Sequence, residues 1–82
     1  MTTEEIERWL VGFVASLLDV PPQLIAATMP FDSLGVDSAT TLVMAADLSE
    51  WLRVELSPVE VFEFATIRSL AERLAAVVPV GG

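Results

Sequence analysis

Histidine, cysteine, lysine and tyrosine are all absent from this sequence of 82 residues. Without histidine or cysteine, the chain has no Ser-His-Asp or Cys-His catalytic group and lacks the usual zinc ligands. Without lysine it cannot form a Schiff base, and without cysteine it cannot form a disulfide. Only carboxylates and hydroxyls remain as reactive side chains. We therefore expect a protein that is not an enzyme and holds no metal.

Positive charge is also scarce, because 4 basic residues stand against 12 acidic ones, for a net charge of −8. Repulsion from phosphates predicts that no nucleic acid binds. An acidic protein surface either favours the binding of basic protein partners or serves only to keep the protein soluble.

Long apolar runs are missing as well. The charge-free stretch 9–18 has ten residues, which is too short to span a bilayer. The acidic N-terminus does not resemble a secretory signal. We expect a soluble, cytoplasmic, monomeric domain with no membrane partner.

Apolar residues account for 54% of the chain and recur at helical spacing. The first helix begins at a capping box, with Thr2 at the N-cap and Glu5 three residues on. Pro21 and Pro22 are expected to end it, because residues before proline avoid the α region. Its apolar positions form one stripe of period 3.6, made of Ile6, Trp9, Leu10, Phe13, Val14, Leu17 and Leu18.

A long connection over residues 19–36 follows, and it can include a helical turn near residues 23–27. A connection of this length is usually functional or locally packed. Four apolar residues are expected to hold it against the core, namely Leu24, Ile25, Phe31 and Leu34.

Three more helices are expected. One runs from Ser38 to about residue 51 or 52. A short helix begins after Ser57, with Pro58 at its first position and Glu60 completing a capping box, and ends near residue 63 or 64. The last helix starts at Thr66 and stops before Pro79.

The pattern predicts an all-α fold, a small bundle of three main helices plus one short helix with a long first loop. Residues 1–79 are expected to form the single domain and residues 80–82 a flexible tail.

The helix that begins at Ser38 has two apolar faces on a helical wheel. One face matches the stripe that a bundle helix buries, and it contains Thr41, Met44, Ala45, Leu48 and Leu52. The other contains Ala39, Leu42, Val43 and Ala46, flanked by Asp47 and Glu50. Either the long loop folds over this second face, or the face is a strip that partner proteins bind.

The segment "GVDSATTL", residues 35–42, places Ser38 at the start of this helix. Gly35 permits a turn with positive φ, and either Asp37 or Ser38 can cap the helix. The chain offers no base to activate the serine. A phosphate ester at this position would be stabilised by the helix N-terminus. Ser38 is therefore a candidate substrate for another enzyme.

Two segments carry a resemblance to a known family. "FDSLGVDSATTLVMAADL" is similar to the attachment segment of the acyl carrier proteins, and "ELSPVEVFEFATIRSLAERL" resembles their third and fourth helices. The resemblance covers almost the whole chain. It implies that Ser38 carries 4′-phosphopantetheine, transferred from coenzyme A, and that Asp37 helps to position this site.

The resemblance also implies a set of partners. These are a phosphopantetheinyl transferase, an acyl-loading enzyme (an acyltransferase or an adenylating ligase), and a ketosynthase or other acyl-processing enzyme. They would bind the second apolar face, on Ala39, Leu42, Val43, Ala46, Asp47 and Glu50.

Two residues depart from the family pattern, since Ala39 replaces a larger aliphatic residue and Val43 replaces a common glutamate. The end of the chain, "VFEFATIRSLAERLA", most resembles carriers of modular polyketide synthesis. The expected function is thus to carry acyl intermediates as thioesters in polyketide or hybrid secondary-metabolite biosynthesis. The alternatives are a peptidyl carrier of nonribosomal peptide synthesis and an acidic interaction module that is never loaded.

Overall fold

The computed structural model describes residues 2–77, which form four α-helices and one short 3₁₀ helix. In chain order these are α1 (Thr3–Leu18), η1 (Pro22–Leu24), α2 (Ser38–Leu52), α3 (Pro58–Phe62) and α4 (Ile67–Val77). The all-α bundle with a long first loop is confirmed. The predicted domain end at residue 79 and the tail 80–82 lie outside the described residues.

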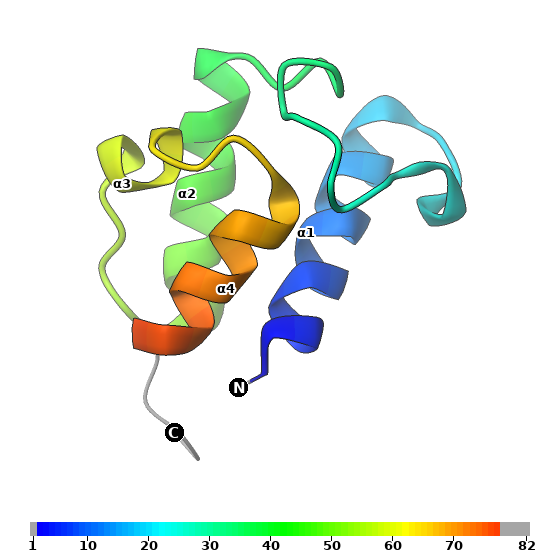
Figure 1. Ribbon diagram of the computed structural model, residues 1–82. Helices are drawn as coiled ribbons and strands as arrows, with labels where there is room; N and C mark the ends of the chain where they lie inside the picture. The colour runs from blue at the N-terminus through cyan, green and yellow to red at the C-terminus, as the bar shows by residue number, and fades with distance from the viewer. Residues whose placement is uncertain (1, 78–82) are drawn as a thin grey trace.

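The helices pack around one core (Figure 1). α1 and α2 run in opposite directions, α4 packs against α1, and α3 contacts α2. The fully buried side chains come from all four α-helices, and the largest are Ile6, Leu10, Val14, Met44, Leu48, Val61, Ile67 and Leu70. Burial of these apolar side chains is the main source of the stability of the fold.

The first helix begins and ends as predicted, with the connection starting at residue 19. Thr2 and Glu5 form the capping box. α1 stops at Leu18 because Asp19 adopts a left-handed conformation with φ 57°, two residues before Pro21. The apolar stripe is not buried along its whole length, since Leu17 and Leu18 in the last turn are exposed.

The long loop is tied to the start of α4 by backbone hydrogen bonds. The N–H of Phe31 donates to the carbonyl of Ala65 at 2.8 Å, and the N–H of Arg68 donates to the carbonyl of Ala27 at 2.9 Å. Ile25 and Leu34 are buried as predicted, whereas Leu24 is 66% exposed, and that prediction was wrong. The helical turn is a 3₁₀ turn that lies slightly earlier than expected.

The last two helices begin at the predicted caps. The hydroxyl of Ser57 accepts from the N–H of Val59, so the cap does not use the N–H of Glu60 that the capping box requires. The hydroxyl of Thr66 accepts from the N–H of Ser69 at 3.1 Å, and the Ser69 hydroxyl accepts from the N–H of Thr66 at 3.3 Å. This reciprocal pair fixes the start of α4.

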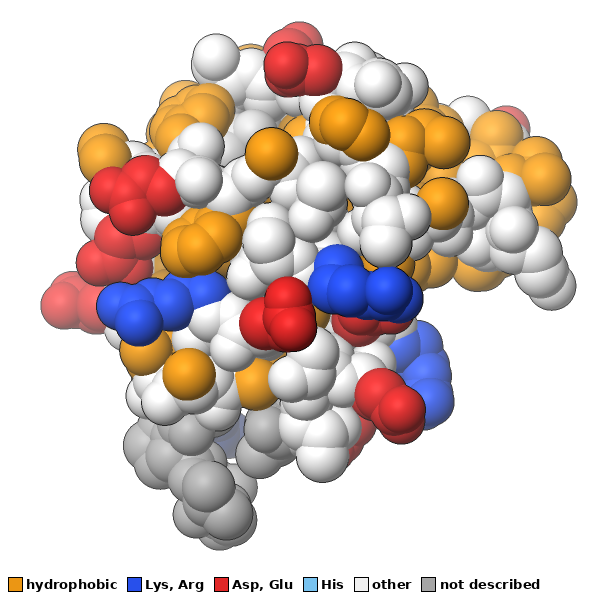
Figure 2. Space-filling view, in the orientation of Figure 1, with side chains coloured by type: hydrophobic (Ala, Val, Ile, Leu, Met, Phe, Trp, Pro, Cys, Tyr) orange, Lys and Arg blue, Asp and Glu red, His pale blue; other side chains and the backbone are white. Residues whose placement is uncertain are grey.

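The charged and apolar side chains of the surface are unevenly distributed (Figure 2). In this view hydrophobic side chains gather at the upper right, over the long loop and the end of α1, and acidic side chains gather at the left, near α3. None of the helices in residues 2–77 is both long and apolar enough to cross a membrane.

Candidate functional site

The N-terminal end of α2 is positioned by the last residues of the long loop. Gly35 has φ 80°, a conformation that side chains with a Cβ rarely adopt. Val36 follows it, buried in the core, and its N–H donates to the carbonyl of Phe31 at 3.1 Å. The turn and this anchor bring Asp37 and Ser38 to the surface at the helix start.

Asp37, and not Ser38, is the N-cap of α2. Its carboxylate accepts a hydrogen bond of 2.8 Å from the N–H of Thr40. This hydrogen bond is the main reason why the pKa of Asp37 is lowered. The carbonyl of Asp37 also accepts from the hydroxyl of Thr41 at 2.9 Å, which holds the first turn in place.

The side chain of Ser38 is exposed at the first position of α2. Within residues 2–77 its hydroxyl has no hydrogen-bond partner, because the neighbouring Asp37 does the capping. An exposed hydroxyl that does not contribute to the fold can be esterified without breaking an interaction of the bundle.

A hollow of about 450 Å³ opens beside Ser38. It lies between the long loop, the start of α2 and the α3 region, and its walls combine apolar side chains with polar ones, among them Asp32 and Asp37. The lining residues include Phe31, Val36, Thr41, Met44, Val61, Phe62 and Phe64. The side chain of Phe62 is half exposed at this hollow.

The second apolar face of α2 is open to solvent. Leu42 and Val43 are 52% and 56% exposed, and Ala39 and Ala46 are exposed beside them. The long loop therefore does not cover this face, and the alternative in which it does is wrong. The predicted core face is buried in full, namely Thr41, Met44, Ala45, Leu48 and Leu52.

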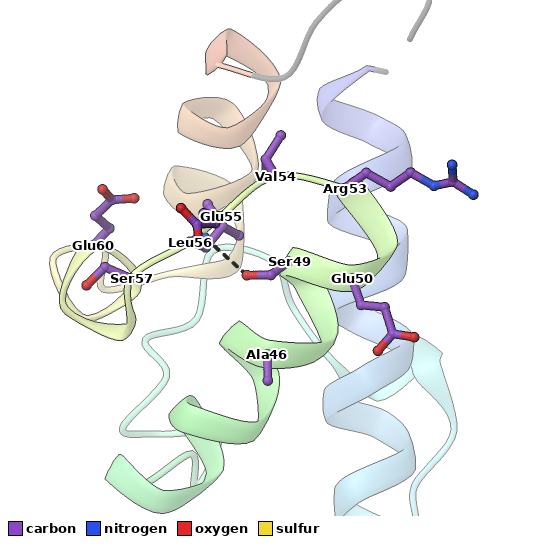
Figure 3. Close-up of a pocket in the computed structure, with 9 residues that line it drawn as sticks. All are labelled: Ala46, Ser49, Glu50, Arg53, Val54, Glu55, Leu56, Ser57 and Glu60. Atoms are coloured by element: carbon purple, nitrogen blue, oxygen red, sulfur yellow. Dashed lines mark hydrogen bonds between the residues drawn. The ribbon is translucent and has the colours of Figure 1, made fainter.

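A second hollow, of about 800 Å³, borders this face on its α3 side (Figure 3). Ala46 and Ser49 of α2 face it, and the Ser49 hydroxyl accepts a hydrogen bond of 3.1 Å from the N–H of Leu56. Glu50 extends from α2 in the direction of α1, away from Ser57 and Glu60. Asp47 and Glu50 both border a smaller hollow on the α1 side of α2.

Sequence reasoning missed two groups of contacts. One brings Phe31 and Phe64, from separate segments, beside Ser38. The other is the contact between Trp9 and Trp51, whose rings stack with centroids 5.3 Å apart. Both are long-range contacts, which helical periodicity does not predict.

Comparison with known proteins gives a consistent result. Residues 8–74 match the family described as the phosphopantetheine attachment site. The chain is 30% identical to the acyl carrier protein TtuC of Teredinibacter turnerae over 76 residues, which are 93% of this chain and 87% of that protein. It is 31% identical to one polypeptide of the phenolphthiocerol/phthiocerol polyketide synthase of Mycobacterium tuberculosis, of which it spans 4% while 92% of this chain is aligned.

Two solved structures have the same fold. An acyl carrier protein from Anabaena sp. PCC 7120, which has a variant phosphopantetheinylation-site sequence, is 36% identical, with a TM-score of 0.87 over 95% of this chain and 89% of that one. A free-standing peptidyl carrier protein of a secondary metabolic pathway of Acinetobacter baumannii is 28% identical, with a TM-score of 0.87 over 95% of this chain and 98% of that one.

Proposed function

The chain belongs to the phosphopantetheine attachment-site family, and we propose that Ser38 is the residue to which its 4′-phosphopantetheine is attached. As a carrier domain it is homologous to acyl carriers of polyketide synthases and to carriers of peptide synthetases. The observation that carries the proposal is the exposed Ser38 hydroxyl at the first position of α2, next to a cap that leaves it free.

The residues at the start of α2 fit a phosphodiester. A negative group on the Ser38 oxygen would lie at the N-terminus of a 15-residue helix, where unpaired N–H groups and the helix dipole stabilise an anion. The hollow beside Ser38 offers apolar side chains, among them Phe31 and Phe62, to the arm or its cargo. When bound, the group supplies a thiol that carries acyl groups as thioesters, and this chain has no thiol of its own.

The chain is proposed to catalyse no reaction itself. The carboxylate nearest to Ser38 in sequence is Asp37, and its lowered pKa makes it a weak base. It is also engaged by the N–H of Thr40. Proton removal from Ser38 is therefore assigned to the transferase that loads it.

The proposed partners are a phosphopantetheinyl transferase, an acyl-loading enzyme and a ketosynthase or other acyl-processing enzyme. The docking strip consists of Ala39, Leu42, Val43 and Ala46, which begin next to Ser38 and are all exposed. A predominantly apolar strip buries best against an apolar patch on the partner. We place this carrier in polyketide or hybrid secondary metabolism.

A peptidyl carrier is the second candidate, because the Acinetobacter baumannii carrier has the same fold over nearly its whole length. The two functions differ in the acid that the arm holds. Incubation with coenzyme A and a broad-specificity transferase should add the mass of one phosphopantetheine group to the wild type and none to Ser38→Ala. The acid recovered from the thioester after expression in the native host then separates an acyl from an aminoacyl carrier.

A further inference from the structure

The end of the long loop, residues 31–37, forms a turn that is closed on Phe31, and this turn carries the chain to Ser38. The carbonyl of Phe31 accepts two hydrogen bonds, from the N–H of Leu34 at 3.0 Å and from the N–H of Val36 at 3.1 Å. Val36 is followed directly by Asp37, the N-cap of α2. The place of Phe31 therefore helps to set where α2 begins and where Ser38 is presented.

Phe31 also joins this turn to a distant part of the chain. Its N–H donates to the carbonyl of Ala65 at 2.8 Å, and an isolated bridge pairs the preceding Pro30 with Thr66. Within residues 2–77, the bond to Ala65 is the one backbone hydrogen bond recorded between residues 30–36 and another segment. The turn thus depends on a single backbone link to the rest of the bundle.

The acceptor of this link lies at the junction of α3 and α4, and the junction is itself held on both sides. Before Ala65, the N–H of Phe64 donates to the carbonyl of Val61 at 3.2 Å. After it, the reciprocal pair of Thr66 and Ser69 fixes the start of α4. The carbonyl of Ala65 is therefore a firm point of attachment for the turn.

The turn has a second kind of anchor, the side chains of Leu34 and Val36, which are buried in the core. Burial of apolar surface is favourable but non-directional, so these side chains hold the turn against the core without fixing its orientation. A hydrogen bond of 2.8 Å is directional, because it weakens steeply as its angle departs from linearity. The link from Phe31 to Ala65 can therefore supply the orientation that the apolar contacts do not.

We propose that Phe31 is a positioning residue for the loading of Ser38, and that it acts through the hydrogen bond from its N–H to the carbonyl of Ala65. In the loading step the Ser38 oxygen forms a bond to the phosphorus of coenzyme A that carries pantetheine. The bond from that phosphorus to the oxygen bridging the two phosphates breaks, 3′,5′-adenosine bisphosphate leaves, and the serine proton passes to a base of the transferase. Such a transfer needs its reacting atoms about 3–3.5 Å apart and aligned, and a misplacement of about 1 Å is costly.

The proposal predicts which kinetic constant depends on the link. The docking strip lies on α2 itself, so a transferase should still bind a carrier whose turn is loosened. The Ser38 oxygen would then be aligned in a smaller fraction of the bound complexes. Loss of the link should therefore lower kcat of loading and leave KM for the carrier nearly unchanged.

This inference rests on the proposed function, because it concerns the loading of Ser38. The two can fail separately. A wild-type protein that is never loaded refutes the proposed function, and this role of Phe31 with it. A wild type that is loaded, together with a variant that is loaded equally fast, refutes the role of Phe31 alone.

The experiment removes the N–H of Phe31 and keeps its ring. The variant Phe31→phenyllactic acid, made by chemical synthesis, replaces the amide with an ester. The matched control is the hydroxy-acid analogue of Arg68, whose N–H makes the other backbone link between the loop and α4, to the carbonyl of Ala27 at 2.9 Å. Each ester also weakens the preceding carbonyl as an acceptor, so the two variants are matched in this respect.

Both esters should lower the urea midpoint of unfolding by a similar amount, since each removes one backbone hydrogen bond. They should differ in loading, measured with a phosphopantetheinyl transferase, saturating coenzyme A and a varied concentration of carrier. With the Phe31 ester, kcat should fall about tenfold and KM should stay within about twofold of the wild type. With the Arg68 ester, both constants should stay within about twofold of the wild type.

Hydrogen exchange of the wild type is a second measurement, and it needs no variant to fold. The Phe31 amide should exchange at least about tenfold more slowly than in an unfolded peptide of the same sequence. Four results would overturn the proposal. They are an unprotected Phe31 amide, an unchanged kcat in the Phe31 ester, an equal fall of kcat in the Arg68 ester, and a rise of KM without a fall of kcat.

Discussion

The carboxylate of Asp37 accepts a hydrogen bond of 2.8 Å from the backbone N–H of Thr40. This contact makes Asp37 the N-cap of α2 and leaves Ser38, the next residue, exposed and free of that task. Asp37 therefore stabilises the helix, and Ser38 is available for modification.

Replacing Asp37 should affect stability through this cap. Asp37→Ala is expected to lower the urea midpoint of unfolding, and Asp37→Asn should retain most of the cap because its side-chain oxygen accepts the same N–H. The folded-state pKa of Asp37 is lowered, so its contribution is present in full above about pH 4 and is lost as the pH falls through the lowered pKa. Urea unfolding of wild type and Asp37→Asn between pH 5 and pH 2 checks this. A wild type that loses no stability relative to Asp37→Asn in acid would contradict it.

The two glycines Gly12 and Gly35 should respond in opposite directions to alanine. Gly35 has φ 80°, and a Cβ there would have room, 3.9 Å from Leu18, so the cost of Gly35→Ala is backbone strain of about 1–2 kcal/mol. Gly12 is helical with nothing within 4 Å of an added Cβ, so Gly12→Ala should stabilise by about 0.5–1 kcal/mol. Denaturant unfolding of both variants measures this, and a stabilising Gly35→Ala would refute the left-handed turn at this glycine.

Two leucines of α2 test which face is buried. Leu48 is fully buried and Leu42 is half exposed. Leu48→Ala should cost about 2–4 kcal/mol of unfolding free energy, whereas Leu42→Ala should cost less than about 1 kcal/mol and should instead weaken partner binding. Equal losses in a denaturant titration would mean that both faces are covered.

The sequence predicted the core face of α2 in full because one helical stripe fixes which residues share a side. It failed for Leu17, Leu18 and Leu24, since periodicity does not say whether another element covers a given turn. For the same reason, periodicity alone does not say whether the second apolar face of α2 is covered. The path of the long loop depends on hydrogen bonds between its backbone and residues 65 and 68. No pattern of side chains in the sequence predicts these hydrogen bonds.

The site could be predicted only as far as it is local. Gly35, Asp37 and Ser38 are close in sequence, and their residue types predict the turn and the helix start. They do not decide between Asp37 and Ser38 as the cap, which the hydrogen bond from Thr40 does. The hollow beside Ser38 needs Phe31, Phe62 and other side chains from separate segments. The stack of Trp9 on Trp51 likewise joins α1 to the end of α2.

Introducing a charge into the docking strip should impair transfer to the native partner. Val43→Glu places a carboxylate at an exposed apolar position, where an apolar partner surface would leave it unpaired on binding. We expect kcat/KM of acyl transfer to the partner to fall about tenfold. Ala76→Glu adds the same charge at an exposed position of α4 and should leave transfer unchanged. Equal kinetics for wild type and Val43→Glu would contradict the assignment of the strip.

The chain supplies its own control for the attachment residue, because Ser33 follows Asp32 just as Ser38 follows Asp37, and both serines are exposed. Ser33 lies in the long loop, whereas Ser38 begins α2. The most direct test is fragmentation mass spectrometry of the protein after reaction with coenzyme A and a phosphopantetheinyl transferase. The group should be found on Ser38 alone, with full loading in Ser33→Ala and none in Ser38→Ala. A modified Ser38→Ala protein, or a wild type that never gains the group, would contradict the proposed role of Ser38.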